Sequence, residues 1–257
     1  MKKFISIILS AALILSLAAC GNSNASSDEP KKELPLASQS PQQPEATPLY
    51  KDIMKPYNEI KHGSRLIVLQ NTLVFSREGI YTQEETPVAE TIKYNETDYN
   101  AYPVSAATRF FTNGLSDNIT VYTADGTSQS FAGDDFNAAK VLIDDFQSGN
   151  APILLMPDGK FIENFDYAIT ENNEGIFSVV SEQEISLLDL FEKYGWDNTK
   201  TYNVVATDAF YIPVTEQDYD EGGLRGGLSG AVNASFADMT IAMGKLSDAV
   251  FIETIVE

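Results

Sequence analysis

Hydrophobic and polar positions alternate most regularly in two stretches of the chain, residues 119–136 and 202–219. In each stretch a β-branched run ends in an aspartate, Asp125 or Asp208, a small residue follows, and a second alternating segment comes next. A period of two is typical of half-buried strands, and an aspartate beside a small residue is typical of a turn. Each stretch therefore predicts two strands joined by a tight turn.

A helical pattern precedes each predicted strand pair. Residues 105–114 and 186–195 both begin with a serine, which can cap a helix, and end with a glycine, which tolerates the left-handed conformation beyond a helix end. Because the elements follow the same order, residues 104–136 and 185–219 are predicted to be two copies of one helix–strand–strand unit, an internal repeat.

Elsewhere the pattern predicts further, less regular elements. A clear helix is expected over 134–147, where apolar residues recur at helical spacing after two aspartates. Residues 222–230 are rich in glycine, and no regular element is expected there. Residues 65–76 indicate a buried strand or tight hairpin, and further strands are predicted over 90–94, 152–156, 175–180, 236–243 and 249–256.

The order of these elements indicates an α+β fold with mixed or antiparallel sheets, built of two related units. A Pro-Asp-Gly-Lys turn at 157–160 separates the two copies. A first α+β unit is therefore expected over 56–157 and a second over 158–257.

The N-terminus has the pattern of an export signal. Two lysines precede a mostly apolar run over 4–17, and the small residues Ala18 and Ala19 stand before Cys20. This order resembles the lipobox of bacterial lipoproteins, in which the chain is cleaved before the cysteine and the thiol is lipidated, for example with palmitate. The sequence predicts a signal peptide over 1–19, a lipidated Cys20 and a place on the extracytoplasmic face of the cell membrane. The alternative is a plain signal peptide or a membrane anchor.

Residues 20–55 are predicted to be a disordered linker behind the lipidated cysteine. The segment 21–50 holds five of the eleven prolines and no aromatic residue before Tyr50. Such a composition buries too little apolar surface to offset the entropy of folding.

Composition narrows the chemistry. Cys20 is the only cysteine and His62 the only histidine, so disulfides, thiolate nucleophiles, zinc sites and histidine catalysis are not expected, and no cofactor is predicted. His62 itself is expected to be exposed to solvent. Without Lys2 and Lys3, 15 basic residues face 37 acidic residues, a net charge of −22. A field of that sign repels nucleic acid, which is therefore not expected as a partner.

The glycine-rich segment contains the main candidate binding residues. Arg225 is the only cation between Thr201 and Gly244, and Gly226 and Gly227 follow it. Backbone NH groups of glycines can approach an anion closely, so these residues could form an anion-binding nest around Arg225; the alternative is a mobile connector.

The two turn aspartates are candidates of a second kind. Asp125 and Asp208 could face a ligand, or their carboxylates could bond to backbone NH groups within the turns. The acidic runs at 134–135, 144–145 and 218–221 do not fit the calcium loop with oxygen ligands at alternate positions, so no metal site is assigned.

The second copy also carries a family resemblance. Its leucine-rich helix over 185–195, the following glycine and the strand over 202–208 with its aspartate turn resemble the oxidoreductase molybdopterin-binding domain of the sulfite-oxidase family. In the first copy, Thr123–Gly126 matches the Asp-Gly turn of that family. The molybdenum-ligating cysteine of the family has no counterpart here. The resemblance therefore implies a related scaffold without the metal chemistry.

Together these features predict a surface-anchored lipoprotein that binds a small anionic ligand or a partner protein without catalysis. The alternative is an enzyme, either a carboxylate-dependent hydrolase or a degenerate cofactor-binding oxidoreductase domain. Convergence of acidic residues and Arg225 in one concave pocket would favour a ligand site.

Overall fold

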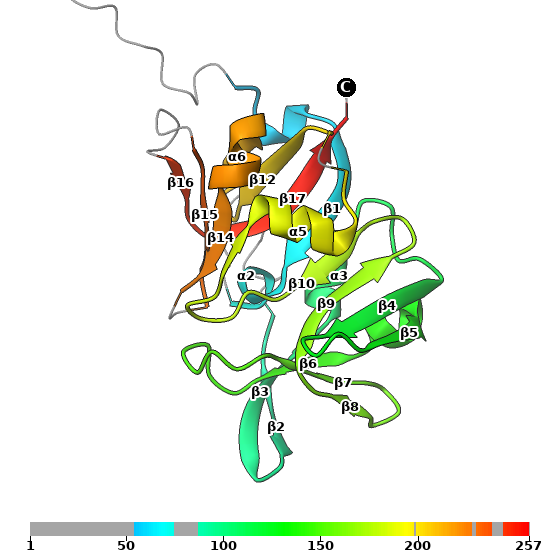
Figure 1. Ribbon diagram of the computed structural model, residues 1–257. Coiled ribbons are helices and arrows are strands. Elements are labelled where there is room, and N and C mark those ends of the chain that lie inside the picture. The colour runs from blue at the N-terminus through cyan, green and yellow to red at the C-terminus, as the bar shows by residue number, and fades with distance from the viewer. Residues whose placement is uncertain (1–53, 75–86, 198, 228–229, 238–243, 257) are drawn as a thin grey trace, which may run out of the picture. The chain divides into compact units, whose positions relative to one another are not determined.

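The computed structural model describes residues 54–74, 87–197, 199–227, 230–237 and 244–256, which belong to one compact unit over 48–257 (Figure 1). This unit is α+β and consists mostly of strands, arranged in three sheets with short helices. The predicted signal peptide, Cys20 and nearly all of the predicted linker lie outside the described residues. Among the helices that are described, none is long and apolar enough to cross a membrane.

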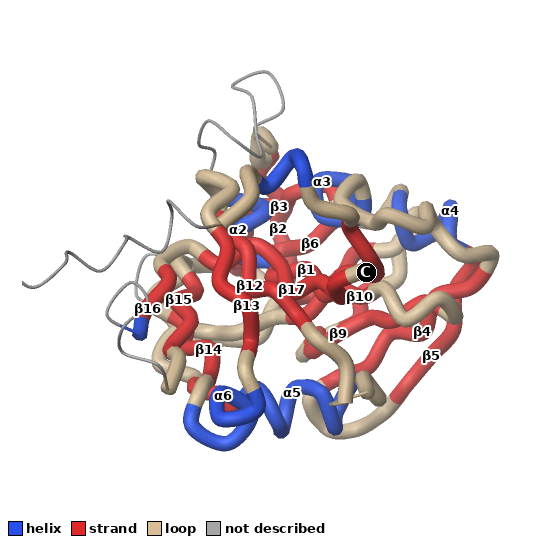
Figure 2. Tube along the Cα trace, turned by 90° about the horizontal axis from the view of Figure 1, so that it is seen from above, coloured by secondary structure: helices blue, strands red, loops and turns tan. Residues whose placement is uncertain are grey.

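Eight strands form the long sheet, in the order β13-β12-β17-β1-β10-β9-β4-β5, which Figure 2 shows one after another. The two middle strands, β1 and β10, run parallel, and the other neighbours are antiparallel. Their bounds are β1 (His62–Val68), β4 (Asn118–Thr123), β5 (Ser128–Ala132), β9 (Phe165–Thr170), β10 (Gly175–Phe177), β12 (Tyr202–Ala206), β13 (Tyr211–Val214) and β17 (Ala249–Ile255).

Two smaller antiparallel sheets flank the long one. The five-stranded sheet has the order β2-β3-β6-β7-β8, with β2 (Glu90–Tyr94), β3 (Thr97–Pro103), β6 (Lys140–Ile143), β7 (Ile153–Leu155) and β8 (Phe161–Ile162). The four-stranded sheet has the order β11-β14-β15-β16, with β11 (Glu184–Ser186), β14 (Gly223–Gly226), β15 (Val232–Ser235) and β16 (Lys245–Leu246). The helices are η1 (Tyr57–Glu59), α2 (Leu69–Val74), α3 (Ser105–Thr108), α4 (Gly133–Asn137), α5 (Leu187–Tyr194) and α6 (Glu216–Glu221).

The long sheet separates two hydrophobic cores. Ile67 of β1 belongs to a core with Val141 of the five-stranded sheet, whereas its neighbour Val68 belongs to a core with Leu224 of the four-stranded sheet. Successive side chains of a strand point to opposite faces, so one central strand supplies both cores. Burying each such side chain contributes about 1.5–3 kcal/mol, which makes both small sheets part of the same folding unit.

Two runs of elements follow the same order along the chain. The first is β3-α3-β4-β5-α4-β6-β7-β8-β9, and the second is β11-α5-β12-β13-α6-β14-β15-β16-β17. The hairpins β4–β5 and β12–β13 form opposite edges of the long sheet, and the small sheets share the order β3-β6-β7-β8 and β11-β14-β15-β16. The last strand of the first run, β9, pairs with β10, which follows it in the chain. The last strand of the second run, β17, pairs in the corresponding position with β1, which precedes both runs.

The expected boundary between 56–157 and 158–257 falls inside the β7–β8 hairpin, whose strands pair at Leu155 and Phe161. In addition, β1 lies between β10 and β17, so both expected ranges contribute strands to the long sheet. The described residues therefore show no break at 157/158.

Several predicted elements differ from the structure. The helix expected over 134–147 ends at Asn137, and Lys140–Ile143 is strand β6. This strand lies between β3 and β7 in the sheet, and both of its faces are covered: Val141 and Ile143 are buried in one core and Leu142 in another, so the run is continuously apolar. Residues 65–76 hold the end of β1 and helix α2, the predicted strand over 175–180 ends at Phe177, and most of the predicted strand 236–243 lies outside the described residues.

The second predicted helix is confirmed at both ends. The Ser186 hydroxyl accepts a hydrogen bond of 3.0 Å from the Asp189 amide, which caps α5. Gly195 follows the helix with a φ of 66°, the left-handed conformation expected for a glycine there. By contrast, α3 of the first copy is only four residues long and has no side-chain cap.

Candidate functional site

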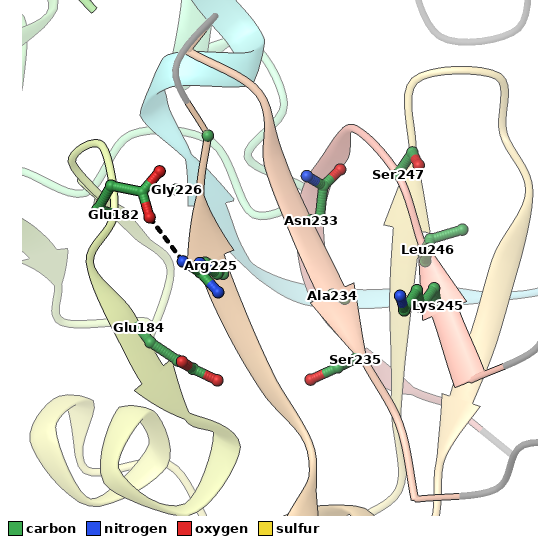
Figure 3. A pocket seen from close by; sticks show the side chains of 11 residues that line it. Glu182, Glu184, Arg225, Gly226, Asn233, Ala234, Ser235, Lys245, Leu246 and Ser247 are labelled. Carbon is green, nitrogen blue, oxygen red and sulfur yellow. Dashed lines mark hydrogen bonds and ion pairs between the residues drawn. The ribbon is translucent and has the colours of Figure 1, made fainter. Parts of the chain in front are cut away.

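A hollow of about 470 Å³ lies on the outer side of the four-stranded sheet (Figure 3). We call it the sheet hollow. Its volume is within the range of small-molecule sites in proteins. Its polar and charged lining residues include Glu182, Glu184, Arg225, Asn233, Ser235 and Lys245.

Strand pairing explains why these side chains share one face. Glu184 of β11 lies opposite Arg225 of β14, which lies opposite Asn233 of β15. Directly opposed residues in antiparallel strands point to the same side of a sheet. Ser235 stands two residues beyond Asn233 and opposite Lys245 of β16, so both also point outward. Their inward neighbour Leu224 is fully buried in the core.

The charges of the sheet hollow are arranged across the strands. The β11 side carries Glu182 and Glu184, and the β16 side carries Lys245 (Figure 3). Arg225 stands between these sides, and its Nη2 lies 2.6 Å from Glu182 Oε2. This hydrogen bond and the two glutamate charges raise the pKa of Arg225 above its ordinary value. The positive charge of Arg225 is thus balanced by the carboxylate of Glu182, whereas in the sequence Arg225 stands as an isolated cation.

The fold itself explains why glycines follow Arg225. A Cβ on Gly226 would lie 2.0 Å from the Val180 carbonyl oxygen, so only glycine allows the chain over 179–181 to pass this closely. The Gly226 amide donates to Gln183 O at 2.9 Å, and the Gly227 amide donates to Ala231 O at 2.7 Å. These NH groups are therefore used by the fold, and the predicted anion nest does not form from them.

The turn aspartates belong to hairpins of the long sheet, whereas the sheet hollow lies on the four-stranded sheet. Asp125 Oδ1 accepts the Thr127 amide at 3.1 Å in the β4–β5 turn, and Asp208 Oδ1 accepts the Phe210 amide at 3.1 Å in the β12–β13 turn. Bonds to threonines and to the Thr127 amide lower the pKa of Asp125. Neither aspartate lines the sheet hollow. Both carboxylates therefore bond to backbone NH groups within their turns, which is one of the two roles that the sequence predicts for them.

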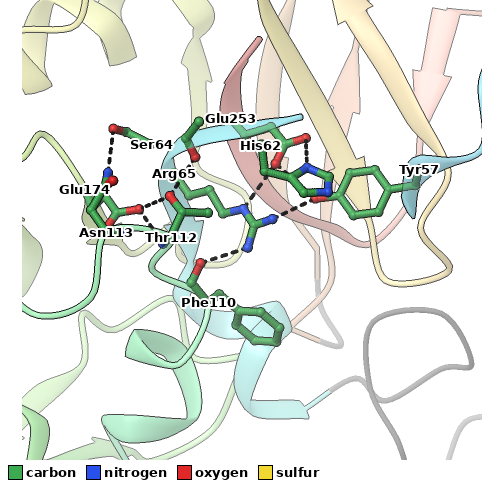
Figure 4. Close-up of polar contacts among 10 residues, drawn as sticks. Tyr57, His62, Ser64, Arg65, Phe110, Thr112, Asn113, Glu174 and Glu253 are labelled. Carbon is green, nitrogen blue, oxygen red and sulfur yellow. Dashed lines mark hydrogen bonds and ion pairs between the residues drawn. The ribbon is translucent and has the colours of Figure 1, made fainter. Parts of the chain in front are cut away.

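A second polar cluster was not foreseen from the sequence. Glu253 of β17, whose side chain is only 1% exposed, accepts hydrogen bonds from Tyr57 Oη at 2.9 Å and Arg65 Nε at 3.1 Å (Figure 4). His62 Nδ1 lies 3.2 Å from the other carboxylate oxygen, and the His62 side chain is 26% exposed, so it is less open to solvent than predicted. Burial, followed by the Glu253 charge, raises the pKa of the Tyr57 hydroxyl. The cluster fastens η1 to β1 and β17.

The outer face of the five-stranded sheet differs in character from the sheet hollow. Tyr94 stacks on Phe161 with ring centroids 4.1 Å apart, and Leu142 beside them is fully buried. The two small sheets thus share a strand order but differ in their outer faces: that of the five-stranded sheet carries an apolar cluster beside the Lys140–Glu90 ion pair, whereas the sheet hollow is lined mainly by charged and polar side chains. Across the described residues no group of three or more His, Cys, Asp or Glu side chains could hold a metal ion.

Two of the partners in the sheet hollow, Glu184 and Lys245, carry no local sequence signal, because strands distant in sequence bring them together. A glutamate or lysine at a strand end is ordinary surface chemistry until the pairing is known. Arg225, Gly226 and Gly227 do line the hollow, as a candidate site from the sequence would require. No protein-family model, no curated protein and no solved structure matches the chain.

Proposed function

We propose that this chain is a lipoprotein held on the extracytoplasmic face of the cell membrane, and that its folded unit binds a small ligand in the sheet hollow without catalysis. The observation that carries the binding role is the convergence of Arg225, Lys245 and two glutamates around one concavity of about 470 Å³. Concave sites with a few convergent polar groups are the usual form of ligand pockets.

Support for the anchor comes from the order of basic residues, apolar run and small residues before Cys20. Replacing Cys20 by serine removes the thiol that would carry the acyl chain. The Cys20→Ser protein is expected in the soluble fraction, whereas the parent chain is expected with membranes and labelled by a palmitate analogue. Undiminished labelling of the Cys20→Ser protein would contradict the anchor.

The ligand site is tested by filling it. Ser235→Trp places an indole in the hollow, and Ser128→Trp places the same group on the exposed edge strand β5 as a matched control. Native mass spectrometry of the purified proteins is expected to detect a bound small molecule with the parent chain and with Ser128→Trp, and to lose it with Ser235→Trp. Equal occupancy in all three proteins, or none in any, would refute the site.

We also infer that the two runs of elements are related units, produced by duplication. The ungapped alignment of 119–136 with 202–219 places β4 on β12, β5 on β13 and α4 on α6. The matching strand orders of the two small sheets support the same view. In this description β1 occupies in the second unit the place that β10 occupies in the first.

A further inference from the structure

We propose that the ligand of the sheet hollow is a short linear peptide of three to four residues with both ends free. This inference rests on the proposed ligand site and specifies its ligand. The peptide lies across the strands, with its terminal ammonium at Glu184 and its terminal carboxylate at Lys245.

The polarity of the hollow sets the direction of the ligand. On the β11 side, Glu182 pairs with Arg225, whereas Glu184 makes no direct ion pair or hydrogen bond within the part of the chain that the structure describes. On the β16 side, Lys245 makes no ion pair or hydrogen bond with the other residues drawn in Figure 3. Glu184 acts on the opposed Arg225 through its charge only, so its carboxylate oxygens remain open to a ligand. A carboxylate and an ammonium group at opposite ends of one hollow match a ligand that carries a cation and an anion at its two ends.

The strand spacing sets the length of the ligand. Glu184 and Lys245 are separated by three strand intervals, about 14 Å at the usual spacing, and by a register offset of two residues, about 7 Å along the strands, which together make about 16 Å. Their side chains can lean inward by several ångströms. An extended peptide spans about 3.3–3.6 Å per residue, so three to four residues reach from one charge to the other. A single amino acid, whose charged groups belong to one residue, is too short to touch both.

The middle of the hollow supplies groups that suit a peptide backbone. Arg225 uses one nitrogen for Glu182, and a guanidinium has five donors, so donors remain for a peptide carbonyl. Asn233 Oδ1 accepts the Asp248 amide at 3.3 Å, which leaves the side-chain NH₂ group of Asn233 as a donor. The Ser235 hydroxyl lies on the same face and donates to Gly223 O at 3.4 Å, so its oxygen remains as an acceptor for a peptide NH. These groups can bond to the amides of a peptide whatever its side chains are.

Titration calorimetry with blocked peptides tests the proposal. Trialanine and a random tripeptide library are compared with trialanine that is acetylated at its N-terminus or amidated at its C-terminus. Each block is expected to weaken binding on the order of tenfold or more, the loss typical of a charge-assisted contact. Free alanine is expected to bind far more weakly than trialanine.

Two variants assign each end. In Glu184→Gln, acetylation is expected to have no further effect while amidation still weakens binding, and in Lys245→Gln the reverse is expected. Equal sensitivity of both variants to both blocks would overturn the orientation. If neither trialanine nor the library binds while Ser235→Trp still displaces another bound molecule, the peptide assignment fails and the ligand site stands. If Ser235→Trp also displaces nothing, the proposed function itself fails.

Discussion

Two arginine–glutamate ion pairs of this fold differ in how far their side chains are buried. Arg65 Nε lies 3.1 Å from Glu253 Oε2, and these side chains are 12% and 1% exposed. Arg225 and Glu182 lie 2.6 Å apart, and their side chains are 60% and 59% exposed. The buried carboxylate depends on its partners because water cannot replace them, whereas the exposed pair exchanges its contact for water at little cost.

Arg65→Met is therefore expected to lower the free energy of unfolding by about 3 kcal/mol, because it leaves Glu253 charged and buried without its cation. The matched control Arg225→Met is expected to change it by less than about 1 kcal/mol. Chemical denaturation at neutral pH measures both. Adding Glu253→Gln to Arg65→Met should recover part of the loss, since the uncompensated charge is then removed. Similar losses for the two single variants would contradict this ranking.

Among the helices and strands, the sequence correctly predicts those defined by neighbouring residues. It does not predict those whose burial depends on strands distant in the chain. Ser186 and Gly195 bracket α5 through contacts within a few residues, so the sequence alone reveals them. In the run Val141–Ile143 the side chains are buried on both faces of the sheet, Val141 and Ile143 in one core and Leu142 in another, and such an apolar run does not distinguish a central strand from a buried helix. In the sequence, Gly226 indicates a loop. In the structure, a glycine is required at this position because residues 179–181 pass too close for a Cβ.

The residues of the candidate site also differ in whether the sequence alone can identify them. Arg225 stands out in the sequence because of its isolation among glycines, and it does line the sheet hollow. Glu184 and Lys245 flank it only because β11 and β16 stand at the two edges of the same sheet. A buried acid such as Glu253 is also invisible to local pattern, since a glutamate within an alternating strand is ordinarily assigned to the exposed face.

In the folded region as a whole, the position of β1 allows a test of the proposal that the two runs of elements are related units. A permuted chain starts at Pro87, runs to Val256 and continues through a short Gly-Ser linker into residues 54–74. It makes the second unit continuous, because β1 then follows β17, its antiparallel neighbour, as β10 follows β9. The permuted protein is expected to fold with a melting temperature within a few degrees of the parent after both are made without residues 1–53.

A control permutation opens the chain inside the first unit, between β4 and β5, with the same linker. It interrupts an edge hairpin of the long sheet and is expected to be less stable than the permutation at Pro87. A lower melting temperature for the Pro87 permutation than for this control would contradict the proposed organisation.

The central position of β1 also governs when the molecule can complete its fold. The strand is synthesised first, yet its two neighbours, β10 at 175–177 and β17 at 249–255, come much later in the chain. Contacts between such distant segments form slowly, because a long loop must close before they contribute. A nascent chain can therefore pair Leu66–Val68 with β10 once residues 175–177 have been made, but the other edge of β1 has no partner until β17 has been made. Because β17 pairs with both β1 and β12, the long sheet cannot be continuous before residues 249–255 have been made.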